Sequence, residues 1–250
     1  MFTQIRAYAI AIVGVLCLAF VVGGCGGGRL ISQSQEVSMG QEAADQFDAE
    51  KGGRDNDPAV VSLVSTIGRR VTQVAKPPDY PYDVRVLANP QVNAVAFPGG
   101  RIYLFRGLVD KFDRNPDHLA WVVGHEATHV AHQHSVKRID QQLGYQAVIA
   151  LVLKQEGAQQ IASAVAGLML LSYSRNEELE ADRGGLTYTH AAGYDPTAAV
   201  AVLQKFQEIQ GQEPNDFEIM FETHPGNTRR LDEVRAHLRN QGWRGKYYQY

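Results

Sequence analysis

The sequence predicts an α+β protein that is mostly helical and has a small antiparallel sheet beside one long helix. Three short segments, Tyr82–Leu87, Val92–Phe97 and Arg101–Phe105, alternate apolar and polar residues as strands do. Nearly everything after Gly107 has the three- and four-residue apolar spacing of helices. The 250 residues suffice for one sizeable core, and we expect a single domain over residues 35–250.

Two helices are expected ahead of these strands, roughly over Gln33–Asp48 and Pro58–Val74. The second has a capping residue, Asp57, and a proline in its first turn, where the fixed dihedral of proline suits a helix. Between the last two strands, the Pro-Gly-Gly segment 98–100 suits a tight turn, because proline fixes one dihedral and glycine permits a positive one.

A long helix should begin at Asn115-Pro116-Asp117 and continue to about Ser135. It has a capping side chain, a proline in the first turn and an acid near its positive end. Residues 146–153 and 161–171 are strongly apolar, but neither stretch reaches the roughly 20 residues that a membrane crossing needs. We expect a buried helical hairpin there, and contact with a membrane surface stays open. Later helices are expected at 175–192, 196–210 and 226–240.

Residues 1–24 have the pattern of a secretion signal, with one charge, Arg6, followed by an apolar run. The run ends in small residues before Cys25, which resembles the lipobox of bacterial lipoproteins, where the cysteine is lipidated and cleavage occurs just before it. We expect a flexible tether over residues 25–34. Because Gly26 is not an aspartate, we expect an anchor in the outer membrane that faces the periplasm. The alternative is an uncleaved membrane anchor with an incidental cysteine.

The overall composition excludes several classes of protein. Hydrophobic residues make up 44% of the chain and charged residues 20%, which excludes disordered, collagen-like and multi-pass membrane proteins. The formal net charge of −3, without a basic stripe, gives no indication of nucleic-acid binding. Both cysteines lie within the first 25 residues, so a metal in the folded part must be held by His, Asp and Glu.

The most specific motif is His125-Glu126-x-x-His129 on the long helix. One helical turn separates the two histidines, so both imidazoles can reach a single zinc ion at about 2.0–2.1 Å. Glu126 is turned by about 100° from His125, which places its carboxylate where a general base takes a proton from the attacking water. The small Gly124 leaves room for another backbone. The alternative is a polar helix face with two accidental histidines.

A catalytic zinc needs a third protein ligand and an open fourth position. His132 is excluded because it lies roughly 10 Å along the helix from the first histidine. Glu178 is the candidate, since it can complete a site of two histidines and one glutamate while Asp182, one turn on, accepts a hydrogen bond from a ligating imidazole. The alternative is a solvated acidic first turn, an interpretation that also suits Glu177 and Glu180.

From about Gln41 to Arg235 the sequence resembles the HtpX-like and CAAX prenyl-protease family of zinc metallopeptidases, and in particular its soluble periplasmic lipoproteins without tetratricopeptide repeats. The resemblance rests on Asn93-Ala94, Phe97 to Gly100, Ile102-Tyr103, His125 to His129 with His134, Ser174-Arg175, Glu178, Ala181-Asp182, His224-Pro225 and Arg230. It implies an α+β metallopeptidase in which Glu178 is the third ligand of one zinc ion and Asp182 supports a ligand.

Further assignments concern residues around the metal. His224, just before a proline at a helix start, can stabilise an oxyanion or block the zinc in a resting state; the alternative is an ordinary surface histidine. Tyr173 is a second candidate for the donor role. The strand around Asn93, Ala94 and Val95 is expected to be an exposed edge that pairs with an extended substrate peptide.

The motif and the resemblance together imply a zinc-dependent metalloendopeptidase that degrades misfolded or misassembled envelope proteins. Glu126 is the expected general base, and unfolded envelope proteins are the expected partners. Two alternatives stay open. One is an envelope chaperone or assembly factor with a latent or rarely used zinc site, and the other is a structural lipoprotein in which His224 closes the zinc site.

Overall fold

The structure is a computed structural model, and it describes residues 32–76, 79–139, 141, 158–169, 171–210, 224 and 228–250. Residues Gln33–Tyr250 form one unit of the fold. The expected signal segment, Cys25 and the apolar stretch 146–153 lie outside the described residues. The expectations of lipidation and of a helical hairpin therefore stay predictions.

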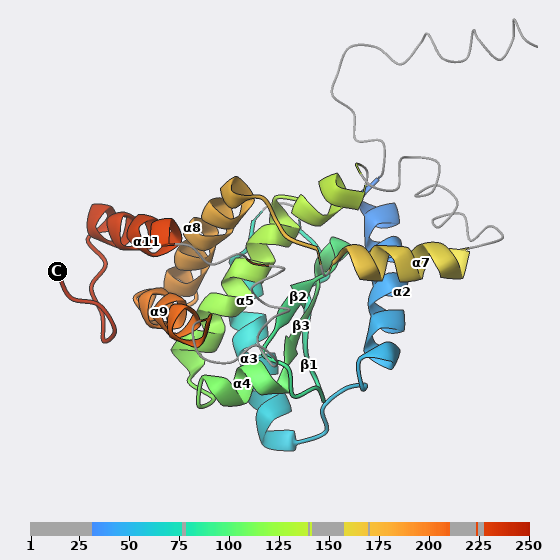
Figure 1. The fold of residues 1–250 in the computed structure, drawn as a ribbon, viewed down its shortest axis with the longest axis horizontal. Helices are drawn as coiled ribbons and strands as arrows, with labels where there is room; N and C mark the ends of the chain where they lie inside the picture. Colours follow the sequence, from blue (N-terminus) through green and yellow to red (C-terminus); the bar gives the residue numbers. More distant parts are fainter. Residues whose placement is uncertain are drawn as a thin grey trace, which may run out of the picture. The chain divides into compact units, whose positions relative to one another are not determined.

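Helices dominate the fold and surround a small sheet (Figure 1). The elements in chain order are α2 (Gln33–Glu50), α3 (Pro58–Thr72), β1 (Asp83–Leu87), β2 (Ala94–Ala96), the 3₁₀ turn η1 (Pro98–Gly100), β3 (Arg101–Phe105), α4 (Arg106–Lys111), α5 (Pro116–Ala131), α7 (Ala158–Leu168), α8 (Arg175–Ala191), α9 (Ala198–Gln210) and α11 (Thr228–Gln241). The helices and strands expected in the described ranges are present, with ends that shift by a few residues. The α+β, mostly helical class is therefore confirmed.

The sheet is mixed, which corrects the prediction of a purely antiparallel sheet. Its strand order is β1-β3-β2, in which β2 pairs antiparallel with β3 and β1 pairs parallel with β3. The chain reverses direction after β1 and again at η1, where Gly99 has a φ of 77°. After two reversals β3 runs in the direction of β1, and because it inserts between β1 and β2, the β1–β3 pair is parallel.

Different helices cover the two faces of the sheet (Figure 1). Because side chains alternate along a strand, Ile102 and Leu104 join the core formed with α3 and α5. Tyr103 and Phe105 belong to the other face, where the ring of Phe47 from α2 lies 6.2 Å from each of their rings. The sheet is thus buried on both sides and supports α5 from one of them.

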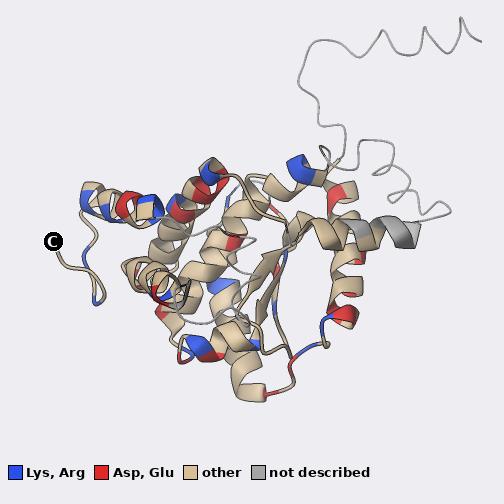
Figure 2. Ribbon diagram, in the orientation of Figure 1, with Lys and Arg blue, Asp and Glu red and all other residues tan. Residues whose placement is uncertain are grey.

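Helix α5 is the central helix of the fold. Every residue from Leu119 to Ala131 is buried, and the helix packs against α3, α8, α9 and the sheet. In Figure 2 its ribbon carries few charged residues, whereas α8 and α11 carry many. An unpaired buried charge is costly, so any charged group that faces inward on α5 needs a partner.

Helix α5 ends earlier than the predicted end near Ser135. It stops at Ala131, and a helix resumes over 134–139. The break is at Gln133, whose φ of 58° is uncommon for a residue other than glycine. The side-chain amide of Gln133 donates to Glu36 Oε2 at 2.8 Å and to the Tyr80 hydroxyl at 3.0 Å, which holds the break in place.

Helix α7 covers much of the second predicted apolar stretch and packs on α2. Its end is tied to the segment after α5, because Arg138 donates to the carbonyl oxygens of Leu168 at 2.8 Å and Leu171 at 2.6 Å. Among the helices that the structure describes, none is both long enough and apolar enough to cross a membrane.

Candidate metal centre

Helix α5 presents three of the predicted residues to one point. The side-chain oxygen of Asn115 accepts two backbone N–H groups of the first turn, which caps the helix as predicted. His125 and His129 lie one turn apart, with ring centroids separated by 4.8 Å, and Glu126 lies beside them. All three side chains are buried.

Helix α8 supplies the other predicted ligand and packs closely on α5. Its capping residue Ser174 forms a capping box with Glu177, which fixes the first turn that carries Glu178. The close packing depends on glycine, because a Cβ atom on Gly124 would lie only 2.9 Å from the carbonyl oxygen of Gly185. This contact lets Glu178 reach the histidines of α5.

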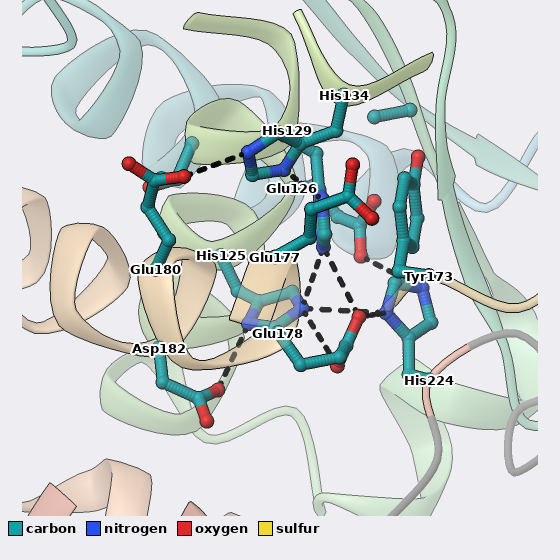
Figure 3. A network of polar contacts seen from close by, with 12 residues as sticks. His125, Glu126, His129, His134, Tyr173, Glu177, Glu178, Glu180, Asp182 and His224 are labelled. Atoms are coloured by element: carbon teal, nitrogen blue, oxygen red, sulfur yellow. Dashed lines mark hydrogen bonds and ion pairs between the residues drawn. The ribbon is translucent and has the colours of Figure 1, made fainter. Parts of the chain in front are cut away.

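The three predicted metal ligands, His125, His129 and Glu178, converge on one place, which we call the metal point (Figure 3). The Nε2 atoms of His125 and His129 lie 3.1 Å apart. The carboxylate oxygens of Glu178 lie 3.4 Å from His129 Nε2 and 3.7 Å from His125 Nε2. Two imidazole nitrogens and one carboxylate therefore face each other in the interior.

Asp182 lies within hydrogen-bond distance of His125, where the resemblance predicts that it supports a ligand. The Nδ1 atom of His125 lies 3.1 Å from Asp182 Oδ1. Burial would raise the pKa of Asp182, but the charge and the hydrogen bonds of Arg230 outweigh this effect and lower the pKa. The ionised carboxylate accepts the Nδ1–H of His125, so the lone pair on His125 Nε2 faces the other ligands.

Arg230 from α11 balances the negative charge of the site. Its Nη1 lies 2.6 Å from Glu178 Oε2, and its Nε and Nη2 donate to Asp182 at 2.8 and 2.6 Å. Burial would raise the pKa of Glu178, but Arg230 and His224 outweigh it and lower the pKa well below its usual value. Spacing along the sequence does not find Arg230, and only the family resemblance points to it.

His224 lies among the predicted ligands and is not a surface histidine. Its Nδ1 is 3.0 Å from Glu178 Oε1 and 3.3 Å from His125 Nε2. Its Nε2 is 3.4 Å from Glu126 Oε1. Burial alone would lower the pKa of His224, but the carboxylates of Glu178 and Glu126 outweigh it and raise the pKa. The charged imidazolium is therefore favoured at this position.

The predicted ligand atoms of His125, His129 and Glu178 fit a zinc ion. Full burial lowers the pKa of His129 well below its usual value, so this imidazole is neutral. Two imidazole nitrogens 3.1 Å apart that both carry lone pairs repel each other, and a cation between them removes the repulsion. Two such nitrogens and one carboxylate are ligands that a catalytic zinc takes. Among the described residues, Glu126 Oε2 is buried without a hydrogen-bond partner, which leaves an acceptor beside the metal point.

Tyr173 is not placed as an oxyanion donor. Its ring stacks on His129 with centroids 3.7 Å apart and an angle of 19° between the planes. Its hydroxyl is engaged with Ser135 Oγ at 3.0 Å, and the guanidinium of Arg138 lies 3.7 Å from the ring centroid. Burial raises the pKa of Tyr173 to about 12. Tyr173 packs against a predicted ligand, and its hydroxyl is engaged elsewhere.

The predicted substrate strand lies at the edge of the sheet but is not exposed. Strand β2 is at the edge in the order β1-β3-β2, yet Asn93, Ala94 and Val95 are at most 3% exposed, because α5 packs against this strand. The ladder bonds of Asn93 and Phe97 to β3 leave the peptide groups of Ala94 and Ala96 on the other edge of β2, where Ser135 Oγ donates to the Ala96 carbonyl oxygen at 3.4 Å. The side chain of Asn93 accepts the Ala94 amide at 2.9 Å.

Two residues outside the predicted site join it through His129. His134 Nδ1 lies 2.8 Å from His129 Nδ1, and His134 Nε2 lies 3.0 Å from Glu180 Oε2. Glu180 also pairs with His132 at 2.7 Å. Glu180 is solvated, as expected, with its side chain 47% exposed, but it also pairs with these two histidines. The spacing of the motif does not reveal this link, because it depends on the break after α5.

Comparison with known proteins identifies the class to which this site belongs. The family model for peptidase family M48 matches residues 60–238, which contain α5 and α8. The chain therefore belongs to peptidase family M48, a family of metallopeptidases. This finding confirms the resemblance seen in the sequence, whereas the lipoprotein assignment stays a prediction.

Named relatives support this assignment. The mitochondrial metalloendopeptidase OMA1 of Arabidopsis thaliana is 35% identical over 150 residues, which cover 60% of this chain and 30% of that protein. The beta-barrel assembly-enhancing protease of Escherichia coli K12 is 28% identical over 227 residues, covering 85% and 45%. The metalloprotease YcaL of the same organism is 26% identical over 197 residues, covering 74% and 75%. The chain thus spans less than half of the length of the first two.

Proposed function

We propose that the chain is a zinc-dependent metalloendopeptidase in which His125, His129 and Glu178 hold one zinc ion. The convergence of these three buried side chains, with Glu126 beside them, is the observation that carries the proposal. When bound, zinc supplies a Lewis acid that polarises the scissile carbonyl and lowers the pKa of water. Membership of family M48 supports the same chemistry.

Glu126 is the proposed general base. It takes the proton of the attacking water and returns it to the leaving amine, and its unpartnered Oε2 atom suits that task. His224, whose Nε2 lies 3.4 Å from Glu126 Oε1, donates to the oxyanion of the tetrahedral intermediate. Asp182 keeps His125 in the tautomer that presents Nε2 to the metal.

The proposed substrates are unfolded or misassembled proteins of the cell envelope. The relative named a beta-barrel assembly-enhancing protease supports this substrate class. An extended peptide would add to the outer edge of β2, with Asn93, Ala94 and Val95 as its binding strand, through backbone hydrogen bonds that replace the contacts of Asn93 and Ser135 with this edge. Recognition through the backbone makes few demands on the substrate sequence, which suits a protease that acts on damaged proteins.

We also propose that the protein is an envelope lipoprotein. Residues 1–24 would be removed, Cys25 would be lipidated, residues 25–34 would form the tether and residues 35–250 the peptidase domain, facing the periplasm from the outer membrane. The lipobox-like residues before Cys25 support this localisation. Replacement of Cys25 by serine should release the protein from the membrane fraction. A Cys25→Ser variant that stays in the membrane would favour an uncleaved anchor.

The position of His224 favours one alternative function, an envelope chaperone or assembly factor with a latent zinc site. Its Nδ1 lies 3.3 Å from His125 Nε2, close enough to occupy the fourth position that a catalytic zinc keeps open. Such a protein would hold its clients and rarely cleave them. It would keep its function in cells after Glu126→Gln, whereas the enzyme would lose it.

Cleavage of unfolded casein by the zinc-loaded chain tests the enzyme assignment. Glu126→Gln should lower the rate by about 10²–10⁴-fold, because it removes the base, while zinc is retained. Glu178→Ala should lose both cleavage and most of the bound zinc, because it removes a ligand. Bound zinc is quantified in each sample.

Two further variants sharpen this test. Glu208→Gln, at an exposed carboxylate of α9, should leave cleavage and zinc content unchanged. His224→Ala should lower cleavage in the active enzyme, because it removes the proposed oxyanion donor, whereas in a latent site it should raise cleavage, because it opens the position that His224 would block. Full zinc occupancy without cleavage, even in the His224→Ala variant, would contradict the enzyme assignment and support the holding role.

A further inference from the structure

The break after α5 turns His134 back towards the metal point (Figure 3). In an unbroken helix, residues five positions apart point about 140° away from each other. The left-handed backbone at Gln133 removes this separation, and His134 Nδ1 lies 2.8 Å from His129 Nδ1. Both imidazoles are buried, with 0% exposure. The break therefore brings a second histidine onto a proposed ligand.

Neighbouring elements hold the break in place. The amide of Gln133 donates to Glu36 of α2, and the Tyr80 hydroxyl donates to the same buried carboxylate at 2.8 Å. An uncommon backbone conformation persists only when the surrounding structure enforces it, and such positions cluster at functional sites. The enforced conformation of Gln133 thus indicates a functional role for the contact between His134 and His129.

The contact between the two histidines fixes which nitrogens carry protons. With its Nε2 towards the metal, His129 carries the proton of its neutral imidazole on Nδ1 and donates it to His134 Nδ1. His134 then carries its own proton on Nε2, which donates to Glu180 Oε2 at 3.0 Å. Every donor meets an acceptor, and the chain of hydrogen bonds ends on a carboxylate whose side chain is 47% exposed.

We propose that His134 and Glu180 are positioning residues for His129. Glu180 holds the tautomer of His134, and His134 holds the tautomer and the ring orientation of His129. This inference rests on the proposed function, because it takes His129 as a zinc ligand. Asp182 does the same for His125, but Asp182 is buried, whereas Glu180 reaches the surface.

A separate metal site at His132, His134 and Glu180 is the competing interpretation, since their ligand atoms lie close together. A metal there would take the lone pair of His134 Nε2 and leave the proton of His134 on Nδ1. That proton would face the Nδ1–H of His129 across 2.8 Å. Two metals would therefore disfavour each other, and the hydrogen-bonded chain is the arrangement that is compatible with zinc on His129.

The affinity of the metal-free chain for zinc, measured by competition with a chromophoric chelator, tests the proposal. Glu180→Ala and His134→Leu should weaken zinc binding by roughly 10–100-fold, which is the usual effect of removing a partner of a ligating histidine. His134→Asn should recover most of the affinity, because its Oδ1 atom can take the place of Nδ1 and accept from His129. Thermal unfolding verifies that each variant is folded.

His132→Ala is the matched control for Glu180→Ala. It removes the other partner of the Glu180 carboxylate and leaves the chain of hydrogen bonds to His129 intact. Its zinc affinity should equal that of the wild type. Substitution of zinc by cobalt gives a second measurement, since the visible absorption bands should shift in Glu180→Ala and stay unchanged in His132→Ala.

Each outcome has a separate meaning. Unchanged zinc affinity in folded Glu180→Ala and His134→Leu would overturn the inference and leave the zinc site intact. A wild-type chain that binds no zinc would overturn the proposed function and the inference with it. A second equivalent of bound zinc that disappears in His132→Ala would show a separate metal site and would also overturn the positioning role.

Discussion

Arg230 carries the positive charge that two buried carboxylates share. It contacts Glu178 at 2.6 Å and donates twice to Asp182, and all three side chains are buried. A buried ion pair contributes little to stability compared with apolar packing, but removal of one partner leaves an uncompensated charge and is strongly destabilising. Arg230 therefore matters because it makes the two carboxylates tolerable in the interior.

Replacement of Arg230 by methionine should destabilise the metal-free protein by about 3–5 kcal/mol at pH 7. The pKa values of Glu178 and Asp182 are lowered in the folded state, partly by Arg230, so their stabilising contribution is present above the unfolded pKa of about 4 and is lost as the pH falls through the folded values. The deficit of the variant should therefore be large at pH 7 and smaller at about pH 3, below the unfolded pKa of about 4. Urea unfolding at both pH values measures it.

Arg229→Met is the control for this prediction. Arg229 precedes Arg230 on the same helix, but its side chain is 63% exposed and pairs with Glu233 only at 3.9 Å. Its replacement should change stability by no more than about 0.5 kcal/mol at either pH. A deficit of Arg230→Met that is equal at both pH values would contradict the charge-balance account.

The sequence alone predicts the site residues that lie on one helix, but it does not determine which residues of other elements join them. His125, Glu126 and His129 follow from helical spacing, because one turn separates the ligands. Glu178 needs the family resemblance, because its distance from His129 depends on how α5 and α8 pack. The charge balance and the link to Glu180 depend on contacts between elements that no local pattern encodes.

The contact between α5 and α8 sets the distance between the ligands that the two helices carry. The backbones approach closely at Gly124, Gly184 and Gly185. A Cβ atom on Gly124 would meet the carbonyl oxygen of Gly185 at 2.9 Å, and one on Gly184 would meet Thr128 at even shorter range. Because backbone atoms cannot move aside as a side chain can, any side chain at Gly124 must push the helices apart.

Gly124→Ala should therefore destabilise the protein by about 1–3 kcal/mol, although alanine is the better helix former by about 1 kcal/mol. It should also weaken zinc binding, since it moves Glu178 away from the two histidines. Chemical unfolding and zinc titration measure the two effects. Gly167→Ala is the matched control: Gly167 is helical and has nothing within 4 Å of an added Cβ, so it should gain up to about 1 kcal/mol. A stabilised Gly124→Ala variant would contradict this account.

At the level of elements, periodicity predicts the helices well and misses how they end and how the strands pair. The capped starts of α3 and α5 follow from Asp57 and Asn115. The early end of α5 does not follow from the local sequence, because the left-handed conformation of Gln133 is held by a hydrogen bond to the distant Glu36. The parallel β1–β3 pair does not follow from local sequence either, because the position of β3 between β1 and β2 depends on how the whole sheet assembles.

On the scale of the whole unit, the metal point is where α5, α8, α11 and the residue His224 meet. No single element supplies the proposed ligands, so the unfolded chain lacks the site, and a bound metal would stabilise the folded state. The sheet and α3 support α5 from one side, and α2 holds the break that follows it. The site is therefore a property of the folded unit.

Zinc should stabilise this unit against heat. At a free concentration 100-fold above its dissociation constant, the metal should contribute about 2.7 kcal/mol and raise the Tm by roughly 5–10 °C, and chelation should reverse the rise. Glu178→Ala should lose most of this response, because one ligand is gone. Scanning calorimetry with zinc and with chelator provides the measurement, and an equal response of the wild type and Glu178→Ala would contradict the proposed ligand set.

X-ray diffraction from crystals of the zinc-loaded chain, recorded on both sides of the zinc absorption edge, locates the zinc ion and identifies its ligands. We expect one anomalous peak within about 2.0–2.2 Å of His125 Nε2, His129 Nε2 and a carboxylate oxygen of Glu178, with a position left open for substrate. A peak on His132, His134 and Glu180, or one closed by His224 as a fourth ligand, would contradict the catalytic site proposed for this protein.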